Sequence, residues 1–213
     1  MNIGHLALSV ALIVSGYCIG CISTSYYVTR LRTGQDIRDL GSGNAGAQNA
    51  GRVFGAHWFV IILLLDMAKG YVVVATGAAL EVGDVTLTIA VVSVVSGHIW
   101  PAQLGFRGGM GIATSLGALT AFHWLATAGI VAVFAVAYFP QVWIGRQIAS
   151  KAAARSAVAA INLVALALVL LKQPLMSWLS LIILGFVHYA GYRSRMASGW
   201  PRPARDKAVA YEN

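Results

Sequence analysis

Charged residues are scarce in this sequence. Only 10% of its 213 residues are charged and 58% are hydrophobic, and the mean hydropathy is +0.74. A soluble domain carries about 25% charged residues, and a chain this short cannot hide so much apolar surface from water. The composition excludes a soluble enzyme, a disordered tail and a fibrous protein. It indicates an all-α integral membrane protein.

Cysteine is also nearly absent. The two cysteines, Cys18 and Cys21, are too few for a disulfide framework and lie within an apolar run. Redox and metal sites need several ligands in a polar setting. We therefore interpret both cysteines as small residues of a membrane helix, and we expect no metal and no cofactor.

Several apolar runs approach the ~20 residues that a helix needs to cross a bilayer. They lie at about Leu6–Thr29, Ala56–Leu80, Val85–Leu104, Ile112–Phe122, Trp124–Trp143, Ala157–Leu171 and Leu175–Tyr192. The polar pair His123 and Trp124 marks the expected break between the fourth and fifth runs. We predict seven transmembrane helices, with six as the alternative. Residues 1–200 should form one membrane-embedded domain, and residues 201–213 a basic cytoplasmic tail.

Acidic residues are few, and the basic residues fall in alternate loops. Seven Asp and Glu face fifteen Lys and Arg, a net charge of +8. The cations cluster after the first, third, fifth and last runs, at Arg30, Arg32, Arg38, Arg52, Arg107, Arg146, Lys151, Arg155, Arg193, Arg195, Arg202, Arg205 and Lys207. Short loops rich in Lys and Arg stay in the cytoplasm, so the N-terminus should lie outside and the C-terminus inside. Such charge also attracts anionic lipid headgroups, and we expect membrane lipids rather than nucleic acid as partners.

The loop after the first run combines glycines with polar side chains. Glycines that adopt positive φ let several backbone N–H groups point toward one anion. Ser42, Asn44 and Asn49 add side-chain donors, and Arg52 adds a forked cation suited to phosphate. The stretch from residue 36 to residue 52 therefore predicts an anion-binding loop, with a flexible linker as the alternative.

A charged pair interrupts the second run. Asp66 and Lys69 are three residues apart and share one helical face. A charge at bilayer depth is costly, so the two should be paired and face the interior of the bundle. Two interpretations remain open, a structural ion pair and a pair that lines a polar cavity.

A second cationic glycine loop follows the third run. Pro101 should end or kink that helix and place His98 near the membrane surface, beside Arg107 and its neighbouring glycines. His98 is therefore a candidate base or phosphate donor, with a structural role as the alternative. His188, near the end of the last run, could converge on the same place.

Three motifs carry a family resemblance. They are Gly41-Ser42-Gly43-Asn44-x-Gly46-Ala47-x-Asn49 with Arg52 and Gly55, Leu65-Asp66-x-x-Lys69-Gly70, and Gly97-His98-x-x-Pro101 with Phe106-x-Gly108-Gly109-x-Gly111-x-Ala113-Thr114. They resemble GSGNxGATN, LDxxKG and GHxxPxxxxFKGGKGxAT of the bacterial acyl-phosphate:glycerol-3-phosphate acyltransferase family, the PlsY type. The resemblance implies a seven-helix enzyme of the bacterial inner membrane whose active face is cytoplasmic. It would transfer a fatty acyl group from acyl phosphate to glycerol 3-phosphate, giving lysophosphatidate for phospholipid synthesis.

The resemblance also implies roles for individual residues. Ser42, His98 and Arg52 are the catalytic candidates. The substrate-binding candidates share the glycine motifs or the face beneath them: Gly43, Asn44, Asn49, Lys69, Arg107, Gly108, Gly109, Gly111 and His188. An acyl phosphate is already activated, so such a reaction needs no metal.

Some positions depart from the family patterns. Gln48 replaces a Thr, Arg107 replaces the first Lys of FKGGKG, and Met110 replaces its second Lys. Of the third family motif, RHxxNIxRLxxGxE, this chain keeps His188 and has Gly191 at the Asn position. A thioether cannot supply an ammonium, so the alternative is a non-catalytic or substrate-shifted homologue that binds phosphorylated lipid. A transporter is a third hypothesis, disfavoured because the two halves show no inverted repeat.

Overall fold

The computed structural model describes residues 3–122, 124, 128, 185, 188–191 and 193, and all regular structure in this part of the chain is helical. Five α-helices bear labels: α1 (Ile3–Cys21), α2 (Thr24–Thr33), α3 (Ala47–Phe54), α4 (Ala56–Ala79) and α5 (Asp84–Ile99). Two 3₁₀ turns, η1 (Ile37–Asp39) and η2 (Ala102–Leu104), precede the two glycine segments. We call residues 41–46 the first glycine segment and residues 106–111 the second. A further apolar helix covers Ile112–Phe122. The expected spans at 124–143, 157–171 and 175–192, and the tail at 201–213, lie outside the described residues apart from the few named.

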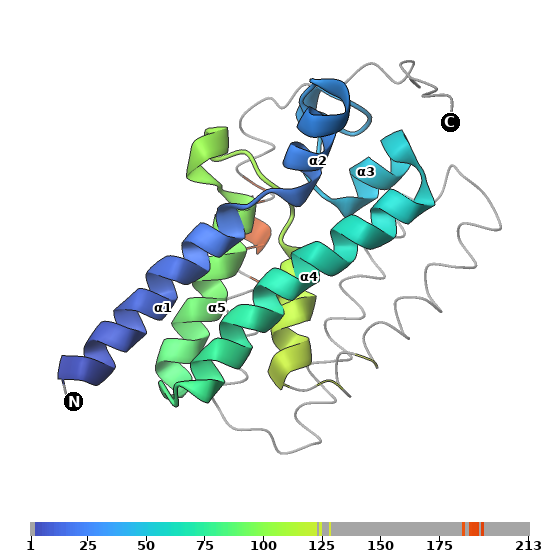
Figure 1. Cartoon of the computed structure of the whole chain (residues 1–213). Helices are drawn as coiled ribbons and strands as arrows, with labels where there is room; N and C mark the ends of the chain where they lie inside the picture. Colours follow the sequence, from blue (N-terminus) through green and yellow to red (C-terminus); the bar gives the residue numbers. More distant parts are fainter. Residues whose placement is uncertain are drawn as a thin grey trace.

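Three segments are long and apolar enough to cross a membrane. They are Ile3–Thr33, Ala56–Ala79 and Asp84–Leu104, with 31, 24 and 21 residues. Figure 1 shows α1, α4 and α5 side by side, with α2 and α3 gathered at the end where α1 stops and α4 begins. We call this end of the bundle the loop end.

The first span differs from its prediction. A single helix from Leu6 to Thr29 was expected, but α1 stops at Cys21 and α2 starts at Thr24. Ser23 takes an extended conformation, with φ −74° and ψ 94°, at the N-cap position of α2. The backbone of Ile22 therefore leaves the helix, and its carbonyl oxygen is free to accept a hydrogen bond from another element.

Glycines let α1 and α5 touch backbone to backbone. A Cβ on Gly20 would overlap the carbonyl oxygen of Val94, and one on Gly97 would overlap that of Tyr17. Small residues allow such approaches between membrane helices. A buried apolar cluster surrounds this crossing and contains Leu12, Val73, Ala90, Val94, Val95 and Ile99.

The end of α5 follows its prediction. The helix stops at Ile99, two residues before Pro101, and η2 follows. Tyr17 Oη donates a hydrogen bond of 2.8 Å to the Trp100 carbonyl, which fixes the turn against α1. The chain after α5 therefore stays at the loop end.

Candidate active site

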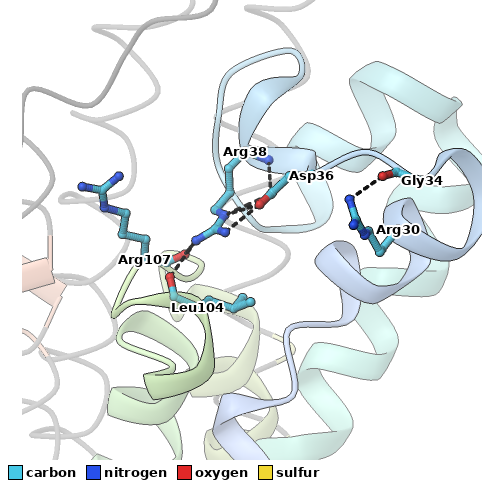
Figure 2. Close-up of polar contacts among 6 residues, drawn as sticks. All are labelled: Arg30, Gly34, Asp36, Arg38, Leu104 and Arg107. Carbon is cyan, nitrogen blue, oxygen red and sulfur yellow. Dashed lines mark hydrogen bonds and ion pairs between the residues drawn. The ribbon is translucent and has the colours of Figure 1, made fainter.

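The two glycine segments meet at the loop end. The carbonyl oxygen of Ala45, in the first segment, borders the space that a Cβ on Gly109, in the second, would fill. Arg38 links the segments further: its Nη1 donates to the carbonyls of Leu104, at 2.7 Å, and Arg107, at 3.5 Å (Figure 2). The cationic loops predicted from residues 36–52 and 106–111 are thus in contact with each other.

Arg38 and Asp36 are site-shaping residues that sequence reasoning missed. Asp36 accepts hydrogen bonds from the Arg38 backbone N–H at 2.8 Å and from Nε and Nη2 at 2.9 and 2.6 Å. Partial burial acts to raise the pKa of the Asp36 carboxyl, but the hydrogen bonds and charge of Arg38 outweigh it, so that this pKa lies below its ordinary value. The same hydrogen bonds raise the pKa of Arg38. The acid–x–base spacing at 36–38 is the sequence signal that could have revealed this pair.

Asn49 holds the first glycine segment in shape. The residue is fully buried. Its Oδ1 accepts from the Ser42 backbone N–H at 2.7 Å, and its Nδ2 donates to the carbonyls of Ile37 and Leu40 at 3.1 and 2.9 Å. Because its donors and its acceptor are engaged inside the protein, Asn49 shapes the loop rather than offering its amide to a ligand. The direct substrate contact expected of it is not supported.

Half of the expected first loop is helical. Helix α3 begins at Ala47, so Asn49 and Arg52 project from a helix and not from a loop. The preceding turn uses positive φ at Gly41 and Gly43, 55° and 72°, a region that glycine enters without strain. The side chains of Ser42 and Arg52 are exposed, and Asn44 is half-buried. These three remain placed to meet a ligand.

The second glycine segment is pressed against the end of α5. The backbone N–H groups of Gly108 and Gly109 donate to the carbonyls of Ile99 and His98, each at 2.9 Å. A Cβ on Gly108 would overlap the His98 carbonyl, and one on Gly109 would overlap His98 Nε2. The glycines are therefore required by close packing, whatever they bind. Gly111, with φ 81°, turns the chain into the helix at Ile112–Phe122.

The side chains of this second segment face outward. Arg107 is exposed, and Figure 2 shows its side chain extended away from Arg38. Met110 is 43% exposed. The position of the second lysine of FKGGKG is thus at the surface of the loop end.

The charged pair of α4 lies beneath the loops. Lys69 Nζ is 2.7 Å from Asp66 Oδ1, and Asp66 also accepts from Thr24 Oγ1 at 2.9 Å. Lys69 donates to the Ile22 carbonyl at 2.7 Å, in the break between α1 and α2. Its third neighbour is His98 Nδ1 at 3.3 Å. All three charged or titratable side chains are buried, so the structural ion pair is present, and Lys69 is not positioned as a direct substrate ligand.

His188 comes close to the same end of the molecule. Its Nε2 is 3.5 Å from Ser115 Oγ, four residues after Gly111. A Cβ on Gly191 would contact Ile99, at the end of α5. The structure therefore brings His188 near the second glycine segment, as the sequence suggested.

No group of three or more His, Cys, Asp or Glu that could hold a metal ion occurs among the described residues. In the same part of the chain, Cys18 and Cys21 are free thiols, one exposed and one buried. The exposed polar side chains gathered at the loop end include arginines and the Ser42 hydroxyl, which suit phosphate.

Comparison with known proteins gives a consistent result. The model of the family described as glycerol-3-phosphate acyltransferase matches residues 10–199. Glycerol-3-phosphate acyltransferase 1 of Bacillus cereus is 42% identical over 126 residues, which span 59% of this chain and 69% of the relative. A glycerol-3-phosphate acyltransferase of Clostridioides difficile is 48% identical over 126 residues, 57% of this chain and 62% of the relative.

A solved structure resembles most of the chain. It is a crystal structure of PlsY, an integral membrane glycerol 3-phosphate acyltransferase, in its glycerol 3-phosphate form. The TM-score is 0.75 at 26% identity, and the match covers 90% of this chain and 92% of that one. The protein is thus an all-α integral membrane protein and belongs to the glycerol-3-phosphate acyltransferase family of the PlsY type.

Proposed function

We propose that the protein transfers a fatty acyl group from acyl phosphate to the 1-hydroxyl of glycerol 3-phosphate, giving lysophosphatidate and inorganic phosphate. One observation carries this proposal. In a member of this family, the two glycine segments are in contact at the loop end, where Arg38 links them and several arginines gather. Both substrates carry phosphate, and the loop end offers arginine cations and the Ser42 hydroxyl for it.

In this reaction the bonds form and break within the two substrates. The substrate hydroxyl attacks the acyl carbonyl, a C–O ester bond forms, and the C–O bond to phosphate breaks. The hydroxyl proton leaves with the phosphate. What the protein supplies is alignment of the two substrates and stabilisation of the charge on the carbonyl oxygen and the departing phosphate.

Exposed side chains of the loop end take the direct roles. Ser42 and Arg52, with Gly43 and Asn44, are assigned to the acyl phosphate, where a hydroxyl and a forked cation can meet phosphate and carbonyl oxygens. Arg107 and the backbone of Gly111 are assigned to glycerol 3-phosphate, with His188 beside them. The N–H groups of Gly108 and Gly109 shape the segment instead, because they donate to carbonyls at the end of α5. His98 lies where the segments meet.

Two of the candidates act through other residues. Asn49 fixes the backbone of Ser42, and Lys69 contacts His98 from within the bundle. They position the groups that meet substrate.

The site is proposed to face the cytoplasm from a bacterial inner membrane. The loop end carries Arg30, Arg32, Arg38, Arg52 and Arg107. At the opposite end, the turn after α4 carries Glu81, and α5 begins with Asp84. Basic loops remain on the cytoplasmic side, where soluble glycerol 3-phosphate would be available. Membrane lipid would surround the acyl chain.

The direct test uses purified protein in lipid vesicles, with acyl phosphate and labelled glycerol 3-phosphate. Formation of labelled lysophosphatidate is expected. Arg52→Ala should reduce the reaction at least tenfold while expression stays normal, because a charge-assisted phosphate contact is lost. Arg30→Ala, which removes another arginine of the loop end, should have a much smaller effect. Equal effects of the two variants would remove Arg52 from the site.

A non-catalytic homologue that binds phosphorylated lipid is the second candidate, favoured by Met110. This residue occupies the position of the family's second lysine and is 43% exposed, so a lysine fits there without repacking. Met110→Lys should raise the rate of lysophosphatidate formation, whereas Met110→Gln, similar in length but uncharged, should not. Binding of glycerol 3-phosphate without any product, in both the wild type and Met110→Lys, would favour the second candidate.

A further inference from the structure

Lys69 lies within hydrogen-bond distance of His98 inside a buried polar cluster. The Lys69 ammonium lies 2.7 Å from Asp66 Oδ1, 2.7 Å from the Ile22 carbonyl oxygen and 3.3 Å from His98 Nδ1. An ammonium has three N–H donors and no acceptor. Its three protons match three acceptors when His98 Nδ1 accepts. Nδ1 lies 3.9 Å from Asp66 Oδ1, too far to donate to that carboxylate instead.

The other contacts of this cluster hold the ammonium in place. Asp66 is 1% exposed and Lys69 8%, so the pair is hardly screened by water. Thr24 Oγ1 donates to Asp66 Oδ1 at 2.9 Å and fixes the carboxylate from the start of α2. The Ile22 carbonyl accepts from Lys69 only because the chain leaves helical geometry between α1 and α2. Contacts from α2, from α4 and from the break between α1 and α2 thus direct one N–H of Lys69 toward the imidazole of His98.

A neutral imidazole whose Nδ1 accepts a hydrogen bond carries its proton on Nε2. Nε2 of His98 borders the space beside Gly109, which the Ala45 carbonyl also borders. The N–H of His98 is therefore directed to the junction of the two glycine segments. A general base needs an unprotonated nitrogen there, and this tautomer does not provide one.

We infer that Lys69 is a positioning residue that holds His98 in the Nε2-protonated form, so that His98 serves the reaction as a hydrogen-bond donor and not as a general base. The inference rests on the proposed acyl transfer for its catalytic meaning, but the tautomer itself is a property of the resting protein. Donor capacity at this junction suits an acyl phosphate, whose carbonyl and phosphate oxygens gain negative charge during transfer.

The test is nitrogen NMR of the protein in micelles, with isotope-labelled histidines. The chain has five histidines, and the signals absent from a His98→Asn sample identify His98. We expect a protonated Nε2 and an unprotonated Nδ1. Lys69→Met should shift His98 toward a mixture of tautomers. Ser93→Ala, which removes an α5–α1 hydrogen bond of 2.6 Å to the Ile13 carbonyl, should leave the tautomer unchanged.

A protonated Nδ1 in the wild type, or an unchanged His98 spectrum in Lys69→Met, would overturn the inference. Should Lys69→Met fail to fold, the wild-type spectrum and the activity of two His98 variants decide. Gln places an N–H near the Nε2 position and Asn near the Nδ1 position. His98→Gln should therefore be at least tenfold more active than His98→Asn, and equal activities would contradict a donor role.

The two proposals fail separately. If no lysophosphatidate forms but the tautomer depends on Lys69, acyl transfer is wrong and the positioning stands. If product forms and the tautomer does not depend on Lys69, the positioning is wrong and acyl transfer stands.

Discussion

At the residue scale, a few buried polar side chains determine the backbone of the loop end. Asn49 alone joins the first glycine segment, at the N–H of Ser42, to the carbonyls of Ile37 and Leu40 just before it. A buried polar group left without a partner costs about 1–3 kcal/mol. Losing the Asn49 amide would therefore disturb both the stability of the protein and the position of Ser42.

Asn49→Asp tests this residue with almost no change in shape. The carboxylate cannot donate to the two carbonyls and would lie buried beside them, so we expect the free energy of unfolding to fall by at least about 2 kcal/mol. Gln48→Glu makes the same amide-to-acid change at an exposed neighbour. It should change the free energy of unfolding by no more than about 0.5 kcal/mol. Thermal unfolding in detergent measures both, and similar shifts would contradict the role given to Asn49.

The residue scale also shows where sequence reasoning ends. The pairing of Asp66 with Lys69 was predictable, because it depends on spacing within one helix. The hydrogen bond from Lys69 to Ile22, 47 positions away, depends on a break in another helix that the sequence did not reveal. Asn49 was recognised as important because of its motif, but its buried position required the fold.

At the element scale, the crossing of α1 and α5 depends on how close two backbones can come. Gly20→Ala would force its Cβ against the Val94 carbonyl, and overpacking of this kind costs about 1–3 kcal/mol. Gly16→Ala, one turn earlier on α1, meets the nearest atom, the Ala90 carbonyl oxygen, at 3.3 Å and should change stability by less than about 1 kcal/mol. Unfolding midpoints of the two variants test the crossing; equal midpoints would contradict it.

The link between η1 and η2 gives a pH prediction. The pKa of Asp36 is lowered in the folded protein, so its contribution to stability is complete above the ordinary value of about 3.9 and is lost as the pH falls through the lowered value. Asp36→Asn should therefore destabilise the protein equally at pH 7 and pH 5, and less at pH 3. Unfolding in detergent at the three pH values measures the stability of both proteins. If the wild type and Asp36→Asn were equally stable at pH 5, the prediction would be wrong.

Elements were predicted well where apolar runs and proline define them. The end of α5 before Pro101 and the long helix α4 followed their sequence signals. Helix α3 was missed because Asn and Gly are weak helix formers. Packing of Ala47 and Ala50 on Ile62 of α4 stabilises it instead. The break at Ile22 and Ser23 contains neither glycine nor proline, so only tertiary contacts could reveal it.

At the scale of the whole molecule, the distribution of charge predicts orientation. A variant without Cys18 and Cys21 allows one cysteine to be placed at either end, as Gln48→Cys or Asp84→Cys. Both positions are exposed. A membrane-impermeant maleimide should label position 48 only in inverted vesicles, which expose the cytoplasmic face, and position 84 only in spheroplasts. The reverse pattern would contradict a cytoplasmic site.

The contact between α1 and α5 has a consequence for biosynthesis. Ser93 of α5 donates to the carbonyl of Ile13 in α1, 80 positions earlier in the chain, and α4 is made between them. Apolar surfaces alone do not hold helices together in lipid. The contact between the α1 and α5 backbones therefore forms only after α5 has been synthesised, so α1 enters the bilayer before its main partner helix exists.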